Sequence, residues 1–231
     1  MITFFAAIPA EVGEYELAAD VAHHAAVRRV SPGEPLTVVA GDGARRLGTL
    51  VVAGKKSLRV LVDRVERDPE PAAVHLFLPV ADRDRMLWLA EKAAELQLSS
   101  WTPVLYRRSR SVSPRGEGDA FDRKVLTRMQ SALEQSGGAW LPVIRPTIES
   151  DAFREGIAPG LLLDASGTPL AGHRLLRRGI AFAVGPEGGL EPAEQTVFAD
   201  AGWQPASVGS VTLRFETAAI AALAIARSSL A

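Results

Sequence analysis

The pattern of hydrophobic and polar positions changes at Asp68-Pro69-Glu70-Pro71. Before this segment, β-rich runs separated by Gly-containing turns predict antiparallel strands. The expected strands are Leu36–Ala40, Leu47–Ala53 and Ser57–Val65. Glu16–Val30 has helix-forming composition and stops at Ser31-Pro32-Gly33, which predicts a helix there. Two prolines in four residues cannot continue a strand ladder, so residues 68–71 predict a linker between domains 1–70 and 71–231.

Beyond the linker, strand-like and helix-like segments alternate, which is typical of a doubly wound α/β domain. The expected strands are Val74–Pro79, Trp101–Tyr106, Trp140–Ile144, Gly160–Asp164 and Ile180–Val184. The expected helices are Asp82–Leu98, Phe121–Ser136, Pro192–Ala201 and Glu216–Ser229. Short, continuous apolar runs such as Ile180–Val184 indicate strands buried on both faces of a parallel sheet. Ligands of such sheets bind beyond the carboxyl ends of the strands.

Two Gly-centred turns fall at such strand ends, namely Gly185-Pro186-Glu187-Gly188-Gly189 and Val208-Gly209-Ser210. Glycine has no Cβ, so a ligand can approach the main chain of these turns closely. Neither turn matches a dinucleotide-binding or P-loop pattern. A strand–turn–helix junction that needs glycine only for its geometry explains the first turn equally well.

The second turn leads into Arg214 and Glu216, which precede the Ala-rich segment Ala218–Ala226. Charged residues beside so apolar a segment cost free energy unless they are paired or used in function. One alternative is therefore a structural ion pair, either Arg214–Glu216 or Arg214–Glu187.

The charge balance excludes a molecule that is basic throughout. The 231 residues include 26 Lys+Arg and 27 Asp+Glu, so any contact with nucleic acid must come from local clusters. One basic cluster is Arg28, Arg29, Arg45, Arg46, Lys55 and Lys56, and another is Arg107, Arg108, Arg110 and Arg115. Charge runs of this kind are also common as solvated surface.

The composition also excludes several kinds of site. The chain has no cysteine, which excludes disulfides, thiolate zinc sites and a cysteine nucleophile. Its four histidines show no metal-ligand spacing, and no apolar run reaches membrane-spanning length. We therefore expect a cytoplasmic protein without a metal or a membrane segment.

Several motifs together resemble one family. They are His24, Val27 and Arg29 as H-x-x-V-x-R; Lys92 and Glu95-Leu96 as K-x-x-E-L; Glu134-Gln135-Ser136; Gly185–Gly189 followed by Glu194; and Gly209 with Leu213-Arg214 and Glu216-Thr217-Ala218. In this order they resemble the RsmE family of ribosomal RNA methyltransferases, which belongs to the SPOUT superfamily. The resemblance spans nearly the whole chain.

The resemblance implies a fold and a cofactor. The fold is α/β, with a trefoil-knotted SPOUT domain over residues 71–231 and a small PUA-like β-barrel RNA-binding domain over residues 1–70. The cofactor is S-adenosylmethionine, held mainly by main-chain groups of three loops. The residues that this places at the cofactor are Leu163, Asp164, Gly185, Pro186, Glu187, Gly188, Gly189, Val208, Gly209, Ser210 and Leu213.

The resemblance also implies a reaction, methylation of uracil N3 in small-subunit (16S) ribosomal RNA by a homodimer. Arg214 is expected to stabilise negative charge on the uracil oxygens, and Glu187, Glu134 or Glu216 to take the N3 proton or to orient Arg214. The RNA contacts are expected from Arg28, Arg29, Arg45, Arg107, Arg108 and Arg110. The substrate is either free RNA or the assembled 30S particle.

The chain departs from the family pattern at four positions. Val211 stands where many members have Arg, and Phe215 where they usually have Thr. Gly138 stands where they have Arg, and Glu191 where they often have Ser or Thr. Two alternatives follow, a SPOUT methyltransferase for another nucleotide of ribosomal or transfer RNA, and a catalytically silent, knotted RNA-binding dimer. Binding of S-adenosylmethionine separates the silent protein from the enzymes.

Overall fold

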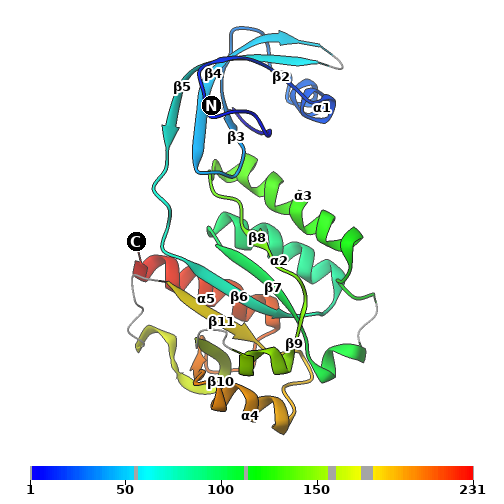
Figure 1. Cartoon of the computed structure of the whole chain (residues 1–231), viewed down its shortest axis with the longest axis vertical. Helices are drawn as coiled ribbons and strands as arrows, with labels where there is room; N and C mark the ends of the chain where they lie inside the picture. Colours follow the sequence, from blue (N-terminus) through cyan, green and yellow to red (C-terminus); the bar gives the residue numbers. More distant parts are fainter. Residues whose placement is uncertain (1, 55–56, 112–113, 156–159, 173–178, 231) are drawn as a thin grey trace. The chain divides into compact units, whose positions relative to one another are not determined.

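The computed structural model describes residues 2–54, 57–111, 114–155, 160–172 and 179–230 (Figure 1). The chain divides into two compact units. The first comprises Met1–Pro71 and Gln130–Leu141, and the second comprises Ala72–Met129 and Pro142–Ala231.

Five strands form the sheet of the first unit, in the order β1-β3-β4-β5-β2. The three expected strands are present as β3 (Pro35–Val39), β4 (Ala44–Ala53) and β5 (Leu58–Arg67), which pair antiparallel. β1 (Ile2–Phe5) pairs parallel with β3, and β2 (Gly13–Leu17) pairs antiparallel with β5. The sequence pattern did not reveal these last two strands.

The helix expected over Glu16–Val30 is shorter in the structure. It is α1 (Ala19–Val27), because Glu16 and Leu17 belong to β2 and pair with β5 instead. The chain leaves the helix at Arg29, which has a positive φ of 54°.

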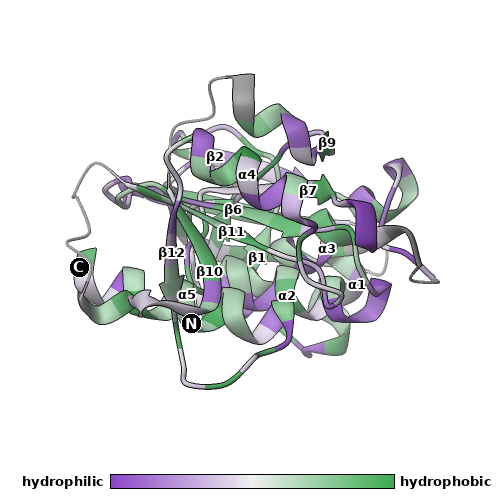
Figure 2. Ribbon diagram, turned by 90° about the horizontal axis from the view of Figure 1, so that it is seen from below, coloured by the Kyte–Doolittle hydropathy of each residue, from purple (hydrophilic) through white to green (hydrophobic). Residues whose placement is uncertain are grey.

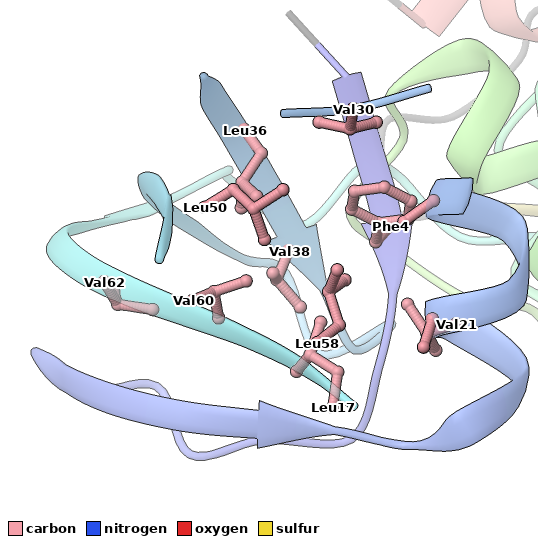
Figure 3. Packing of buried hydrophobic residues seen from close by; sticks show 12 residues of the cluster. Phe4, Leu17, Val21, Val30, Leu36, Val38, Leu50, Leu58, Val60 and Val62 are labelled. Carbon is pink, nitrogen blue, oxygen red and sulfur yellow. The ribbon is translucent and has the colours of Figure 1, made fainter. Parts of the chain in front are cut away.

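The core of the first unit lies between one face of the sheet and α1 (Figure 3). Leu58, Val60 and Val62 of β5 are fully buried, and the residues between them are exposed, as expected for a strand with one face in the core. Phe4 of β1 and Val21 of α1 complete the same cluster. The two strands missed by sequence therefore contribute to the core.

The segment Gln130–Leu141 joins the first unit by hydrogen bonds to the turn between β3 and β4. The amide of Gly43 donates to the carbonyl of Ala139 (2.9 Å), and the amide of Leu141 donates to that of Gly41 (3.1 Å). The expectation of a strand over Trp140–Ile144 is wrong for this reason. Only Val143–Ile144 forms a strand, β8.

Seven parallel strands form the sheet of the second unit. Six follow the order β12-β10-β11-β6-β7-β8, and β9 pairs with β7. Their bounds are β6 Val74–Pro79, β7 Ser100–Leu105, β9 Ile148–Glu149, β10 Leu161–Pro169, β11 Ile180–Val184 and β12 Gln204–Ser207. The α/β architecture expected from the alternation is confirmed.

Helices cover both faces of this sheet (Figure 2). The helices are α2 (Arg83–Glu95), α3 (Asp119–Ser136), α4 (Pro192–Asp200) and α5 (Phe215–Leu230), with the 3₁₀ helices η1 (Arg107–Ser111), η2 (Ser150–Glu155) and η3 (Leu170–Gly172). α2 and α5 pack against each other, and α5 also contacts β6 and β11. On the other face, Phe153, Phe198 and Trp203 form an aromatic cluster under α4 and η2.

Two kinds of feature are absent from the described part of the chain. None of its helices has the length and apolar character needed to cross a membrane. No group of three or more His, Cys, Asp or Glu side chains in it is arranged to hold a metal ion.

Candidate cofactor site

The ends of β11 and β12 lie beside Leu163 of β10 in the second unit's sheet. In the register of the ladders, Leu163 pairs with Val184 of β11 and with Ala206 of β12. The chain leaves β11 into Gly185–Gly189 and leaves β12 into the segment Val208–Leu213, whereas β10 continues to Pro169, with a shift of register between Leu163 and Thr168. The expected strand Gly160–Asp164 is therefore longer in the structure. Of the three loops expected at the cofactor, the first, Leu163-Asp164, is part of β10, and the other two begin beside it.

The turn Gly185–Gly189 is closed by a hydrogen bond from the amide of Gly189 to the carbonyl of Pro186 (2.8 Å). Gly189 has φ of 72°, a conformation that a residue with a Cβ rarely adopts. Arg108 of η1 donates a hydrogen bond to the carbonyl of Gly188 (2.5 Å). A Cβ on Gly188 would lie 3.2 Å from the Cβ of Arg108, so glycine at this position also admits that arginine.

The third loop offers main-chain groups that the described residues do not use. Among the hydrogen bonds of the described residues, none is donated by a backbone amide between Gly209 and Leu213. A Cβ on Gly209 would meet only the Cδ1 of Leu213, at 3.8 Å, so this loop has open space beside its backbone. Unpaired donors next to a Cβ-free position fit a polar ligand held by main-chain contacts.

Asp164, which lies within β10, uses one carboxylate oxygen for local hydrogen bonds. Its Oδ1 accepts hydrogen bonds from the amide of Ser166 (2.8 Å) and from the Ser166 hydroxyl (2.6 Å). These bonds lower the pKa of Asp164 below its usual value. The carboxylate is therefore charged at neutral pH.

Glu194 fixes the segment that carries Arg108. Its side chain is 2% exposed, and it accepts hydrogen bonds from the backbone amides of Arg107 (3.0 Å) and Glu191 (2.9 Å). The buried carboxylate thus joins η1 to the start of α4. Burial and this neighbouring carboxylate also raise the pKa of Tyr106.

Arg85 of α2 has contacts that the sequence did not foresee. Its Nη1 donates to Oε1 of Glu187 (3.4 Å), and its Nε lies 4.0 Å from Oε1 of Glu216. The expected structural pairs of Arg214 with Glu187 or Glu216 are wrong, because neither occurs among the ion pairs of the described residues. Arg85 has that role, and only the tertiary packing of α2 against α5 brings it there.

Arg214 is exposed at the start of α5, where its backbone carbonyl accepts a hydrogen bond from the amide of Ala218 (2.9 Å). Its guanidinium forms no ion pair with a described residue. Glu216, two residues further on, is 6% exposed, and its Oε2 is buried without a hydrogen-bond partner in the described structure.

Glu134 belongs to the first unit and does not join this group. Its Oε1 accepts a hydrogen bond from the amide of Phe5 (2.9 Å), and its Oε2 lies 3.9 Å from Nη2 of Arg28. These contacts tie α3 to β1, which gives Glu134 a structural role within its unit.

The basic residues expected at RNA differ in their availability. Arg28 and Arg29 are exposed, and the Arg107 side chain is 70% exposed. Arg45 is held by Asp68 through three hydrogen bonds of 2.6 to 3.0 Å, and this contact raises the pKa of Arg45. The side chain of Arg110 lies outside the described residues.

Of the remaining members of the first basic cluster, the structure describes only Arg46, and this residue differs from the expectation. Arg46 is not a surface residue as expected. It is 1% exposed and donates hydrogen bonds to Asp42 and to the carbonyls of Pro9 and Ala44. Lys55 and Lys56 lie outside the described residues.

The comparisons with known proteins agree with this arrangement. Residues 68–227 match the family described as RNA methyltransferase domain, and residues 17–63 match the RNA methyltransferase PUA domain. These matches define the class of the protein as an RNA methyltransferase with a PUA-like N-terminal domain.

Individual relatives narrow the family. Ribosomal RNA small subunit methyltransferase E of Mycobacterium bovis is 32% identical over 219 residues, covering 87% of this chain and 80% of the relative. The protein of the same name from Synechocystis is 26% identical over 207 residues, covering 86% and 67%. The chain therefore belongs to the ribosomal RNA small subunit methyltransferase E family, and the resemblance found in its motifs is confirmed.

Solved structures support the same assignment. The crystal structure of a ribosomal RNA small subunit methyltransferase E from Neisseria gonorrhoeae bound to S-adenosyl methionine has a TM-score of 0.88 and 27% identity, covering 99% of this chain and 97% of that one. The methyltransferase Lpg2936 from Legionella pneumophila, with bound cofactor SAM, has a TM-score of 0.87 and 26% identity, covering 99% and 97%.

Proposed function

We propose that this protein transfers a methyl group from S-adenosylmethionine to N3 of a uridine in small-subunit ribosomal RNA. The observation that carries the proposal is the register that brings Leu163 of β10 beside the ends of β11 and β12, where Gly185–Gly189 and Val208–Leu213 begin. The unused amides of Gly209–Leu213 and the open space beside Gly209 fit a ligand recognised by main-chain groups. Membership of the family, and relatives crystallised with S-adenosylmethionine, support the same cofactor.

When bound, the cofactor supplies an activated methyl group on a positively charged sulfur. The protein's part is then to position the uracil and to manage one proton and one developing charge. As N3 bonds to the methyl carbon, the bond from that carbon to the sulfur would break and leave a neutral thioether, and the N3 proton would pass to a carboxylate. Arg214, exposed and free of ion pairs with described residues, stabilises the negative charge on the uracil oxygens.

Glu187 is the carboxylate best placed to take that proton. Its side chain is 35% exposed at the rim of the Gly185–Gly189 turn, where a substrate base can reach it. Glu216 is buried and Glu134 is occupied by the amide of Phe5, so both serve structure. Of the three carboxylates that the sequence offered as proton acceptors, we therefore favour Glu187.

We propose the finer features from the resemblance to the family. The second domain, residues 71–231, contains a trefoil knot, forms the subunit contact of a homodimer and contributes Arg107 to the contacts with phosphates. The first domain, residues 1–70, is the RNA-binding domain and contributes Arg28 and Arg29. The protein acts in the cytoplasm, and its proposed substrate is the assembled 30S particle.

The test uses 30S particles and free 16S RNA from a strain that lacks this enzyme, with labelled S-adenosylmethionine and mapping of the methylated base. The proposal expects one modified uridine, methylated at N3, in the 30S particle. Methylation of a transfer RNA or of another base would favour the alternative with a different target. Failure of the wild-type protein to bind S-adenosylmethionine in a calorimeter would favour the silent RNA-binding dimer.

Arg214→Ala separates the chemistry from cofactor binding. It is expected to bind S-adenosylmethionine normally and to lose about 100-fold or more in methylation rate, as removal of one charge-stabilising group does elsewhere. Methylation at the wild-type rate would remove Arg214 from the mechanism.

A further inference from the structure

Arg85 lies between two loops of the proposed cofactor site without belonging to either. Its guanidinium contacts Glu187, inside the turn after β11, and approaches Glu216, at the start of α5 after the third loop. A planar guanidinium presents several N–H donors in fixed directions, so one arginine can serve two carboxylates. No motif in the sequence marks this residue.

The helix that carries Arg85 is anchored on both sides of it. Asp82, the N-cap of α2, accepts hydrogen bonds at its Oδ1 from the amides of Asp84 (3.1 Å) and Arg85 (3.0 Å). The next residue, Met86, is fully buried. The Cα of Arg85 is thus held by a capped helix end and by the core, while its side chain reaches towards the loops.

Glu216 requires compensation in this position. The residue is only 6% exposed, and its Oε2 has no hydrogen-bond partner in the described structure. A buried carboxylate is costly unless a counter-charge or donors compensate it. Arg85 is the cation that approaches it, at 4.0 Å.

We propose that Arg85 is a positioning residue that ties the turn Gly185–Gly189 to the start of α5 and so sets the geometry in which the two loops hold the cofactor. This inference rests on the proposed function, because it assigns the cofactor to these loops. Arg85 acts through Glu187 and Glu216 and does not touch the reacting atoms.

Geometry and charge predict opposite results when Arg85 is removed. Without it, two carboxylates lose their counter-charge, and Coulomb attraction alone would then strengthen binding of the positively charged sulfonium. A loosened turn would weaken binding instead, and it would do so equally for S-adenosylhomocysteine, whose sulfur carries no charge. The direction and the ligand dependence of the change therefore separate the two effects.

The experiment measures the affinity of the full chain for both ligands by calorimetry, with Arg85→Gln, Arg85→Lys and the control Arg83→Gln. Arg83 is on the same helix, and its side chain forms no ion pair with a described residue. Arg85→Gln is expected to lower the affinity for both ligands by about three- to tenfold. This range corresponds to the loss of a partly exposed ion pair together with its hydrogen bond. Arg85→Lys should recover part of this loss, and Arg83→Gln should stay within about twofold of the wild type.

A double-mutant cycle shows whether Arg85 acts through Glu187. Glu187→Gln should cost less affinity in the Arg85→Gln background than in the wild type, measured at a temperature at which every variant is folded. Arg85→Gln itself should lower the melting temperature, because it leaves the buried carboxylate of Glu216 without its counter-charge. Unaltered affinity in Arg85→Gln, tighter binding of S-adenosylmethionine alone, or additive effects would each overturn the inference and leave the proposed function intact. A wild-type protein that binds neither ligand would overturn the proposed function itself, and this inference with it.

Discussion

Replacing Glu194 with alanine removes a buried side chain that joins η1 to the start of α4 by hydrogen bonds. Its carboxylate is 2% exposed and accepts the amides of Arg107 and Glu191 at 3.0 and 2.9 Å. A hydrogen bond to a charged group contributes about 1.5–3 kcal/mol, and a buried donor left unpaired costs a similar amount. For two such bonds, partly replaced by water in the variant, we expect a loss of about 3–5 kcal/mol in the free energy of unfolding.

The loss is measured by calorimetry of thermal unfolding. In a protein of this size, 1 kcal/mol corresponds to about 2–4 °C in melting temperature, so the melting temperature of the transition that includes η1 and α4 should fall by about 6–20 °C. Cofactor affinity should fall as well, because η1 carries the Arg108 that contacts the Gly188 carbonyl.

Glu191→Gln is the matched control for Glu194→Ala. Glu191 lies three residues earlier, and its 39% exposed side chain is 3.7 Å from Nε of Arg107. An exposed ion pair contributes about 0–1 kcal/mol, so this variant should melt within about 3 °C of the wild type. If the melting temperature of Glu194→Ala were as high as that of Glu191→Gln, the structural role assigned to the buried carboxylate would be refuted.

Two further predictions concern stability. A Cβ on Gly48 would lie 1.8 Å from the backbone carbonyl oxygen of Leu61. Gly48→Ala should therefore force β4 and β5 apart and lower the free energy of unfolding, measured by chemical denaturation, by more than about 2 kcal/mol. The control Gly138→Ala, where a Cβ has room, should change the free energy of unfolding by less than about 0.5 kcal/mol. Equal effects of the two would contradict the packing of this sheet. Burial, with a smaller effect of Arg145, lowers the pKa of His75 below its usual value. The unfolded chain therefore binds the proton more readily than the folded chain does. The free energy of unfolding should consequently fall as the pH drops from about 7 through the lowered pKa. His75→Gln should lose less stability over this range, and an identical pH profile would show that His75 contributes nothing to it.

The fold was predictable from sequence where local pattern determines structure. The continuous apolar runs of β6 and β11 gave the bounds of both strands, because a strand buried on both faces needs no partner to be recognised. The last two residues of β2, Glu16 and Leu17, were predicted as the start of a helix, since only the pairing with β5 reveals them as part of a strand. The prediction of a strand over Trp140–Ile144 was wrong for a similar reason, because the start of this segment is hydrogen-bonded to the turn at Gly41 and Gly43.

The site was predictable in its main chain and less so in its side chains. The Gly turns stand at the ends of apolar runs, so their place at the carboxyl edge follows from the strand pattern. The side-chain contacts depend on residues far away in the sequence. Arg46 bonds to the carbonyl of Pro9, Glu194 bonds to the amide of Arg107, and Arg85 approaches Glu216, across 37 to 131 positions. A charge in a linear sequence does not show whether it will be buried, paired or free.

The central claim is that peptide groups of three loops hold S-adenosylmethionine, and backbone amide NMR of the isotopically labelled protein tests it most directly. A titration with the cofactor should shift or broaden the amide signals of Leu163–Asp164, Gly185–Gly189 and Gly209–Leu213 together, and leave those of the first unit's strands β3–β5 nearly unchanged. Saturable shifts confined to other segments, with these loops unaffected, would contradict the account.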